Sequence, residues 1–200
     1  MATAPAGYAA VHGRADLARH AALLDPLPGP REVRVATTPG RVAGTWNLDV
    51  AGRDRPGLLA RFTGLLADAG IDVVQAVVAT WDDGAALQAY VVRAGHAPDA
   101  SVFSAALDAP LIAEPIAGST LVFDNDASST YTACEVTAPD RHGLLHAVAV
   151  AFANAGVDVH AAAVGTRDGV ARDLFDLTEA GGKVSDRTQA AITRVFRGAQ

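Results

Sequence analysis

WNLDVAGRDRPGLLARFTGLLADAGIDVVQAVVAT, residues 46–80, returns in altered form as TACEVTAPDRHGLLHAVAVAFANAGVDVHAAAVGT, residues 132–166. The two stretches align without a gap, and Asp54 corresponds to Asp140 at an offset of 86 residues. The offset shortens by one residue only at the next turn, where Asp-Gly occurs in both copies. Because loops tolerate such length changes, the slip itself predicts a turn. The chain therefore contains two copies of one structural unit.

Each copy begins with a strand pattern and continues into an amphipathic helix. Residues 45–51 alternate in the first copy, and apolar residues then recur at helical spacing from Leu58 to Ala69. The second copy repeats this helical pattern from Leu144 to Ala155. Gly70 and Gly156 follow directly, and glycine accepts the left-handed conformation that ends many helices.

Two further strands and a second helix complete the pattern of each copy. The strands are joined by an Asp-Gly turn, a strong hairpin signal, and are expected at residues 71–80, 86–93, 157–166 and 170–178. The second helices are expected near residues 98–108 and 185–197. This order predicts an α+β fold of two βαββαβ modules, with antiparallel sheets and the helices on one face.

The fourth strand of the second copy is missing from its expected place, because no strand pattern follows the second helix. The first copy, in contrast, continues with strand-like segments at residues 111–117 and 119–124. We expect either the strand around Glu32–Thr37 or the 119–124 segment to complete the second sheet. The predicted organisation is an N-terminal helical segment with a short strand (1–40), a first module (41–124) and a second module (125–200).

Composition and charge narrow the class of protein. Half of the 200 residues are hydrophobic and 19% are charged, as in an ordinary core-forming chain. A net charge of −6, without a cluster of Lys and Arg, argues against nucleic-acid binding. Neither a membrane span nor a signal-peptide pattern is recognisable, and the single Cys134 excludes an intrachain disulfide. These features predict a cytoplasmic protein with neither membrane nor nucleic acid as a partner.

The D-R-x-G-L-L turn, the following helix and the G-[IV]-D-V strand resemble the ACT domain, an amino-acid-sensing module of ferredoxin-like fold. FDNDASSTYTACEV (123–136) and YAAVHGRADLARHAALL (8–24) are similar to segments of the C-terminal regulatory region in the family of bifunctional PII uridylyltransferase/uridylyl-removing enzymes. The motifs of that family's catalytic domains are absent, and the His-Asp dipeptide does not occur. The resemblance therefore implies a non-catalytic regulator of nitrogen metabolism, with glutamine as the first candidate ligand and no cofactor.

The resemblance also implies where a ligand binds, because paired ACT modules hold amino acids at their interface. The loop after the first strand and the start of the second strand supply the contacts. A glycine in the loop lets the backbone approach closely, N–H groups at a helix start suit a carboxylate, and an aspartate can hold an ammonium group. In this sequence the implied residues are Asp54, Arg55, Pro56, Gly57, Leu58 and Leu59 with Asp72, Val73 and Val74, and Asp140, Arg141, His142, Gly143, Leu144 and Leu145 with Asp158, Val159 and His160.

Other interpretations of these residues stay open at this point. Asp54 and Asp140 are also candidate helix caps, and Asp72 and Asp158 can simply begin strands on the solvent side. A metal site could be formed by three histidines of the second copy, His142, His146 and His160. The first copy has no histidine at the corresponding positions, and no metal is predicted.

The functional alternatives are a ligand-binding regulator and a protein-interaction module that has lost ligand binding. An enzyme is disfavoured because no nucleophile–base pair or phosphate-binding loop stands out. The first helix of the second copy carries Ala147, Val150 and Ala153 off its main apolar stripe. We expect this side to pack against the N-terminal helix or another subunit, which makes a homodimer reasonable. Cys134 is expected in the core.

Overall fold

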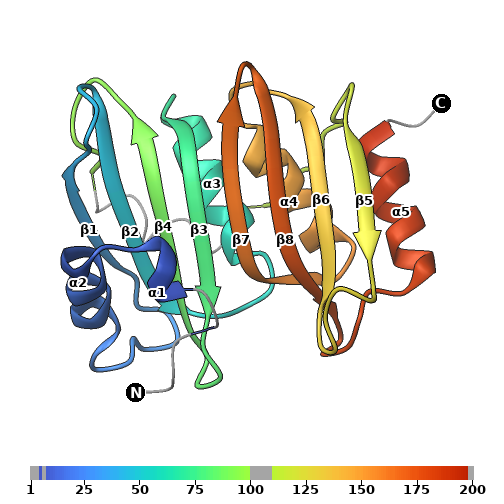
Figure 1. The fold of residues 1–200 in the computed structure, drawn as a ribbon, viewed down its shortest axis with the longest axis horizontal. Helices are drawn as coiled ribbons and strands as arrows, with labels where there is room; N and C mark the ends of the chain where they lie inside the picture. Colours follow the sequence, from blue (N-terminus) through green and yellow to red (C-terminus); the bar gives the residue numbers. More distant parts are fainter. Residues whose placement is uncertain (1–4, 6–7, 100–109, 198–200) are drawn as a thin grey trace.

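The computed structural model describes residue 5, residues 8–99 and residues 110–197. In these residues eight strands form one antiparallel sheet in the order β1-β2-β4-β3-β7-β8-β6-β5 (Figure 1). The strands are β1 (Arg34–Pro39), β2 (Thr45–Arg53), β3 (Asp72–Thr80), β4 (Ala85–Arg93), β5 (Thr120–Asp124), β6 (Thr132–Pro139), β7 (Val157–Arg167) and β8 (Val170–Glu179). The helices are α1 (Tyr8–Val11), α2 (Arg14–Leu24), α3 (Leu58–Asp68), α4 (Leu144–Asn154) and α5 (Asp186–Arg197).

The two halves of the sheet are related by an internal two-fold axis. β3 and β7 pair at the centre, where Val77 faces Ala163. These two residues are themselves equivalent in the 86-residue repeat. Every strand of the first half therefore has a counterpart at the same distance from the centre, and β3 and β7 join the two modules into a single sheet.

Most elements predicted for the two copies are confirmed, as is the α+β fold class. α3 and α4 end before Gly70 and Gly156, whose φ angles of +68° and +74° lie in the left-handed region. Both Asp-Gly turns join antiparallel strands. The helix expected near residues 185–197 is α5, whereas the one expected near 98–108 lies almost wholly outside the described residues.

The fourth strand of the second module is β5, one of the two alternatives expected from the sequence. β5 pairs with β6, and β1 pairs with β2 in the equivalent place of the first module. Although β5 precedes the predicted boundary at residue 124, its hydrogen bonds place it in the second module's half of the sheet. The prediction of a strand at residues 111–117 was wrong, because these residues form no strand. The buried Ile116 instead donates its N–H to the carbonyl of Phe196 at 3.1 Å.

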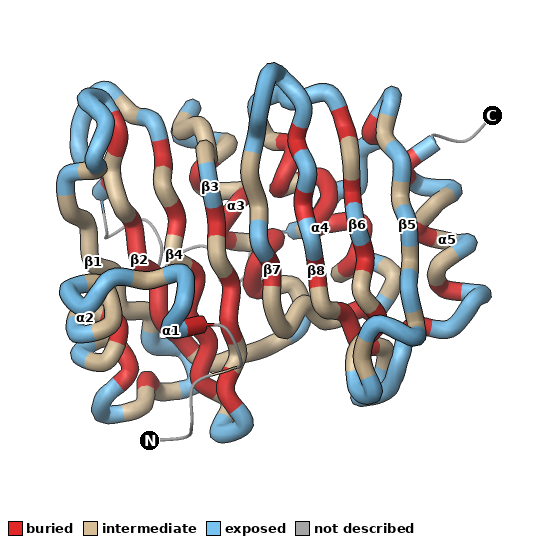
Figure 2. Tube along the Cα trace, viewed as in Figure 1, coloured by how far each residue is buried: buried red, intermediate tan, exposed pale blue. Residues whose placement is uncertain are grey.

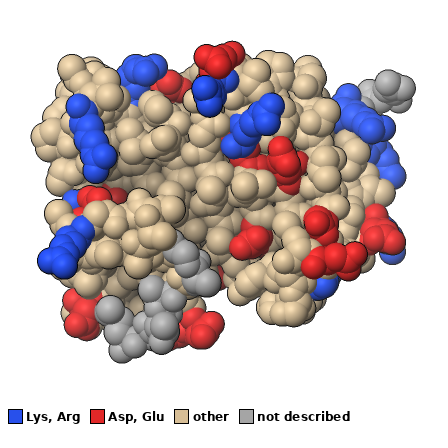
Figure 3. All heavy atoms as spheres, viewed as in Figure 1, with Lys and Arg blue, Asp and Glu red and all other residues tan. Residues whose placement is uncertain are grey.

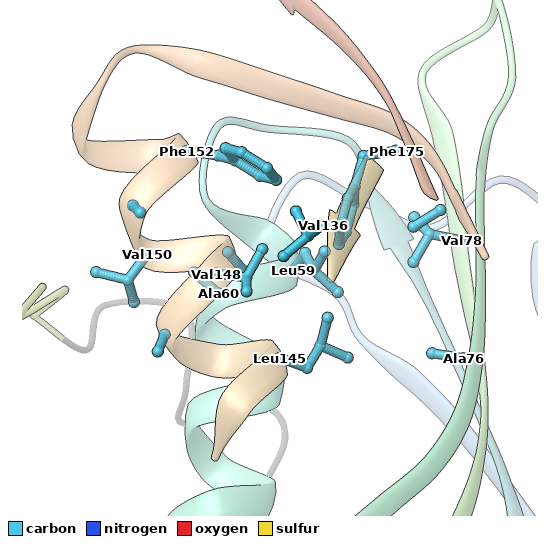
Figure 4. Close-up of a cluster of buried hydrophobic side chains, with 14 of the residues drawn as sticks. Leu59, Ala60, Ala76, Val78, Val136, Leu145, Val148, Val150, Phe152 and Phe175 are labelled. Atoms are coloured by element: carbon cyan, nitrogen blue, oxygen red, sulfur yellow. The ribbon is translucent and has the colours of Figure 1, made fainter. Parts of the chain in front are cut away.

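α3, α4 and α5 cover one face of the sheet and enclose the main core with it. Leu145, Val148 and Phe152 of α4 extend toward the sheet, where Phe152 meets Phe175 with ring centroids 5.1 Å apart (Figure 4). Figure 2 shows the buried residues concentrated on this helix layer and the strands beneath it. Cys134 belongs to this core, as predicted.

The neighbour of α4 differs from both expected candidates, because α4 packs against α3. A Cβ atom added at Gly64 of α3 would come within 2.9 Å of His146 Cε1 of α4, and one added at Gly57 would lie 3.5 Å from Ala153. Small residues on both helices therefore permit a close approach. The side of α4 that was expected to contact the N-terminal helix or another subunit is occupied by α3.

The N-terminal helices lie on the opposite face and cover only the first half of the sheet (Figure 1). α2 is fixed there by a buried carboxylate, Asp49 of β2, which accepts a hydrogen bond from Arg19 Nε. His20 Nε2 lies 3.2 Å from Asp49, and His20 Nδ1 lies 2.6 Å from the hydroxyl of Tyr8. Tyr8 also stacks edge-on against Trp81. Among the described residues, no helix is long and apolar enough to cross a membrane.

Candidate ligand pockets at the module interface

Two pockets lie between the modules, related by the internal two-fold axis. Pocket A lies between the loop that precedes α4 and the region where α3 leads into β3. Pocket B lies between the loop that precedes α3 and the start of β7. Each pocket therefore combines the loop of one module with the strand start of the other. This corrects the sequence-based grouping, in which each loop was paired with the strand start of its own copy.

The structure brings most of the predicted ligand-binding residues to these pockets. Pocket A is lined by Asp72, Val73, Asp140, Arg141, Gly143, Leu144 and Leu145. Pocket B is lined by Asp54, Arg55, Gly57, Leu58, Leu59 and Val159. The remaining predicted residues do not line either pocket; they are Pro56, Val74, His142, Asp158 and His160.

The two loops have the same backbone geometry. Gly57 and Gly143 occupy the N-cap positions with φ angles of +75° and +73°, and neither helix has a side-chain cap. Asp54 and Asp140 therefore do not cap the helices, contrary to one interpretation of the sequence. Their own N–H groups instead donate to the carbonyls of Gly84 and Gly169, both at 2.9 Å, which ties each loop to the hairpin of its own module. The uncapped first turns leave backbone donors for a ligand.

The three histidines of the metal alternative are held in different surroundings. His142 Nε2 and His146 Nδ1 each lie 2.8 Å from a carbonyl oxygen of α3, those of Ala67 and Ala60. His160 Nε2 instead lies 2.7 Å from the hydroxyl of Thr178. His146 thus joins α4 to α3, and His142 joins the loop before α4 to α3. Within the described part of the chain no three His, Cys, Asp or Glu side chains form a group suited to a metal ion.

Asp173 is the main feature of pocket A that the sequence analysis missed. Its side chain projects from β8 into the pocket and is only 1% exposed, and it accepts a hydrogen bond from the N–H of Gly165 at 3.2 Å. Burial is the main cause that raises the pKa of Asp173 to about 6; the hydrogen bond from Gly165 opposes this rise, and the nearby carboxylate of Asp140 adds to it. A signal was present, because Asp173 interrupts the inward-facing apolar positions Ala171, Phe175 and Leu177.

Pocket B has a different chemistry at the equivalent position. Gln88 of β4 occurs there in place of Asp173, and it accepts a hydrogen bond from the hydroxyl of Tyr90. Burial also raises the pKa of Asp54 in this pocket; the charge of His160 opposes that rise, whereas Asp158 adds to it. Pocket A therefore offers a buried carboxylate, and pocket B offers an amide in the same place.

Both pockets are narrow in this structure. Their cavity volumes are about 30 Å³ for pocket A and about 20 Å³ for pocket B. A water molecule needs at least about 10–15 Å³ on this measure. Each cavity thus has room for one or two water molecules, and a larger ligand can enter only if the loop of one module and the strand of the other move apart.

A sequence model of the ACT domain matches residues 47–109 and 132–196, which cover both copies of the repeat. The chain belongs to the ACT domain family. The duplicated loops and the antiparallel sheet described above thus belong to a pair of ACT domains. The family's role is regulatory and indicates that this chain takes part in amino-acid sensing.

The relatives of this ACT pair include bifunctional uridylyltransferase/uridylyl-removing enzymes. That of Rhodospirillum rubrum is 28% identical and matches 72% of this chain and 18% of its own length. That of Gluconobacter oxydans is 29% identical and matches 88% of this chain and 22% of its own length. That of Caulobacter vibrioides is 30% identical and matches 86% of this chain and 20% of its own length. The aspartate kinase structure from Synechocystis aligns with a TM-score of 0.42 and 22% identity over 74% of this chain and 26% of its own. The ACT pair thus spans about a fifth of the length of these curated relatives.

Proposed function

We propose that the ACT pair is a non-catalytic regulatory unit that binds a free amino acid in pocket A, with glutamine as the first candidate. The observation that carries this proposal is the buried carboxylate of Asp173, which lies in a pocket beside the uncapped first turn of α4. A buried carboxylate is costly unless a cation pairs with it. An α-ammonium group supplies that cation, and the rest of an amino acid offers a carboxylate for the other side of the pocket.

The opposite wall of pocket A has the groups that a ligand carboxylate needs. The backbone N–H groups in the first turn of α4 carry the positive end of the helix dipole. Arg141 also lines the pocket and can add a charge-assisted hydrogen bond. Thr63 and Thr166 line the remaining wall. The Thr63 hydroxyl donates to the carbonyl of Leu59 at 2.7 Å within α3, so it offers its oxygen as an acceptor for a side-chain amide. A wall of this kind suits the side chain of glutamine.

The small volume of the pocket connects binding with regulation. A ligand must separate the loop before α4 from the start of β3, so it binds preferentially to a conformation in which the two modules lie further apart. A ligand shifts an equilibrium by the difference between its affinities for two states. Binding of the amino acid would thus change the arrangement of the modules, and attached or associated proteins could respond to that change.

Isothermal titration of the protein with each of the twenty amino acids tests the proposal. We expect binding of one or a few amino acids at pH 7.5, and at least a tenfold loss in Asp173→Asn, because the ammonium group loses its counter-charge. Affinity should also fall as the pH drops below about 6, where Asp173 becomes protonated. Gln88→Asn in pocket B is the matched control and should leave the affinity of pocket A unchanged. If Asp173→Asn binds as the wild type does, pocket A is not the site.

The second candidate function is a protein-interaction module that has lost ligand binding. The cavity volumes of about 30 and 20 Å³ favour it, since neither pocket holds an amino acid without rearrangement. Under this alternative, none of the twenty amino acids binds at millimolar concentration, and the pockets stay closed. A homodimer or a protein partner in nitrogen regulation would then carry the function.

A further inference from the structure

The second half of the sheet exposes a face that α1 borders at one side and that no helix of the described residues covers. This open face consists of β5, β6, β7 and β8 on the side opposite α4 and α5 (Figure 1). One row of cross-strand neighbours lies across it, formed by Val122, Glu135 and Leu174. Val122 and Leu174 are 60% and 55% exposed, and Glu135 is exposed between them. Two large apolar side chains thus flank an exposed carboxylate.

The equivalent face of the first half is covered, and the repeat shows by what. Glu135 corresponds to Asp49, and its neighbours Val122 and Leu174 correspond to Ala36 and Ala89. The three first-half residues lie beneath or beside α2. On that face, Arg19 and His20 of α2 engage the Asp49 carboxylate, while Leu17 and Leu23 pack with the buried cluster around Trp81. The same row of the sheet thus binds a helix in one module and is bare in the other.

A groove continues from the covered half onto the open face. It lies between α1 and the strands β3, β7 and β8, has a volume of about 290 Å³, and is lined mainly by apolar side chains. Tyr8 and Val11 form its α1 side, and Ala161, Ala163 and Leu174 form part of its floor. Val11 is 64% exposed at the edge. An element that covers Leu174 can therefore also bury Val11 and fill this groove.

The open face carries more acidic than basic side chains. Asp124 of β5 and Asp176 of β8 lie on the same side of the sheet as Glu135, whereas Arg172 of β8 and Arg167 at the end of β7 are basic residues on that side. Figure 3 shows red acidic groups over this half, with blue basic groups toward its upper edge. A basic partner is favoured over a second copy of the chain, because a second copy would set Glu135 against another carboxylate-rich face.

We propose that the open face is the docking site for a helix of a partner protein that carries an arginine between leucines. The arginine would meet Glu135 as Arg19 meets Asp49, and the leucines would cover Val122, Leu174 and the groove beside α1. This surface is on the face of the sheet opposite α3 and α4, so the proposal does not depend on amino-acid binding in the pockets.

A synthetic peptide of residues 8–27 tests the proposal, because it contains α1, α2 and Arg19 and serves as a surrogate helix. Its fluorescently labelled form is titrated into the full chain, where the chain's own α2 already occupies the first face. We expect saturable binding with one site. Glu135→Arg and Leu174→Asp should each weaken it at least tenfold, and the peptide variant Arg19→Glu should bind poorly to the wild type but regain affinity for Glu135→Arg. Asp68→Arg, an exposed charge reversal on α3, is the matched control and should have no effect.

Thiol labelling locates the bound peptide independently. The natural Cys134 is buried, so Leu174→Cys provides the reactive thiol, and the peptide should slow its alkylation. Val42→Cys, at an exposed loop position before β2, should be labelled at an unchanged rate.

Three results would overturn the proposal. One is absence of binding at about 1 mM peptide, the range of very weak association. Another is binding that ignores Glu135→Arg and leaves the alkylation rate of Leu174→Cys unchanged, which would mean that the peptide displaces α2 from the first face. The third is a concentration-dependent dimer that Leu174→Asp dissociates, because the occupant would then be a second copy of this chain.

Discussion

At Asp173 the chain keeps a carboxylate where the neighbouring inward positions of β8 hold Ala171 and Phe175. Water solvates this carboxylate in the unfolded chain, whereas the fold buries it and provides the N–H of Gly165 as a hydrogen-bond donor. That single donor does not offset the loss of water, so the folded protein favours the protonated form of Asp173, which explains the direction of its pKa shift. An ammonium ligand would reverse that preference.

The first prediction concerns the stability of Asp173→Asn. Because the folded-state pKa of about 6 exceeds the usual Asp value, the folded protein binds more protons than the unfolded chain between about pH 4 and 6. The contribution of Asp173 to the free energy of unfolding thus falls as the pH rises through this window, by about 2–3 kcal/mol. Asp173→Asn should match the wild type near pH 4 and exceed its stability at pH 8. Urea denaturation at both pH values measures this difference, and Asp126→Asn, at an exposed position, is the control. If the stability of Asp173→Asn and of the wild type changes with pH in the same way, Asp173 is not the group with the raised pKa.

A second residue-scale prediction compares two equivalent carboxylates of the repeat. Asp49 is 2% exposed and contacts Arg19 and His20, whereas Glu135 is exposed. Asp49→Ala removes the buried counter-charge of Arg19, whose guanidinium then keeps only the half-buried Asp16 carboxylate, 2.9 Å from Arg19 Nη2, as a partner. The loss should cost about 3 kcal/mol, at the low end for a broken buried ion pair. Glu135→Ala should change the stability by less than about 0.5 kcal/mol. Thermal unfolding of both variants checks the pair, and equal losses would show that the buried ion pair has little role in holding α2.

At the scale of elements, local patterns predicted both α3–β3–β4 and α4–β7–β8 because their signals lie within short windows. Helical spacing from Leu58, the glycines at the helix ends and the Asp-Gly turns all act on neighbouring residues. Segment 111–117 was misassigned for the same reason: its apolar residues suggested a strand, but Ile116 is buried against α5. A short apolar run does not specify which kind of contact buries it.

The grouping of the pocket residues could not be predicted from local patterns. It depends on the pairing of β3 with β7, which brings the loop before α4 to the start of β3. Nothing within either strand specifies that partner. Sequence patterns therefore identified most residues of the two loops. That each pocket combines the loop of one module with the strand start of the other, and that Asp173 lines pocket A, could be seen only in the three-dimensional structure.

The contact between α3 and α4 supports a prediction on Gly64. A Cβ atom there would lie 2.9 Å from Cε1 and 3.1 Å from Nδ1 of His146, whose hydrogen bond to Ala60 restricts its movement. Gly64→Ala gains up to about 1 kcal/mol in helix propensity but loses about 1–3 kcal/mol through overpacking. We expect net destabilisation by chemical denaturation. His146→Ala should remove the clash, so the double variant should be more stable than His146→Ala alone; if it is less stable, the clash is not the cause.

At the scale of the whole molecule, one sheet and one core extend across both modules. The main core contains Leu59 and Tyr90 from the first module together with Phe152 and Phe175 from the second. Neither half can lose its structure without exposing apolar surface of the other. The two modules are thus expected to unfold together.

Two natural probes test this cooperativity, because each reports on one half. Trp46 and Trp81 lie in the first module, and the buried Cys134 lies in the second. Tryptophan fluorescence and the thiol reactivity of Cys134 should follow one urea transition with the same midpoint. Exposure of Cys134 at a different urea concentration from the fluorescence change would show that the modules unfold separately.

β1 and β5 hold the same place in the two halves, and in both cases this strand comes before the rest of its module in the chain. Both copies therefore have all four strands, and each begins with its own edge strand. Such a unit implies an ancestor of half the present length that assembled through the β3 edge as a symmetric pair. Gene duplication and fusion would have turned that contact into the β3–β7 pairing. After the fusion, the residues of the two pockets could change independently. Asp173 and Gln88 are equivalent residues that now differ between the two pockets. In a pair of identical chains, a mutation at this position would have changed both pockets at once.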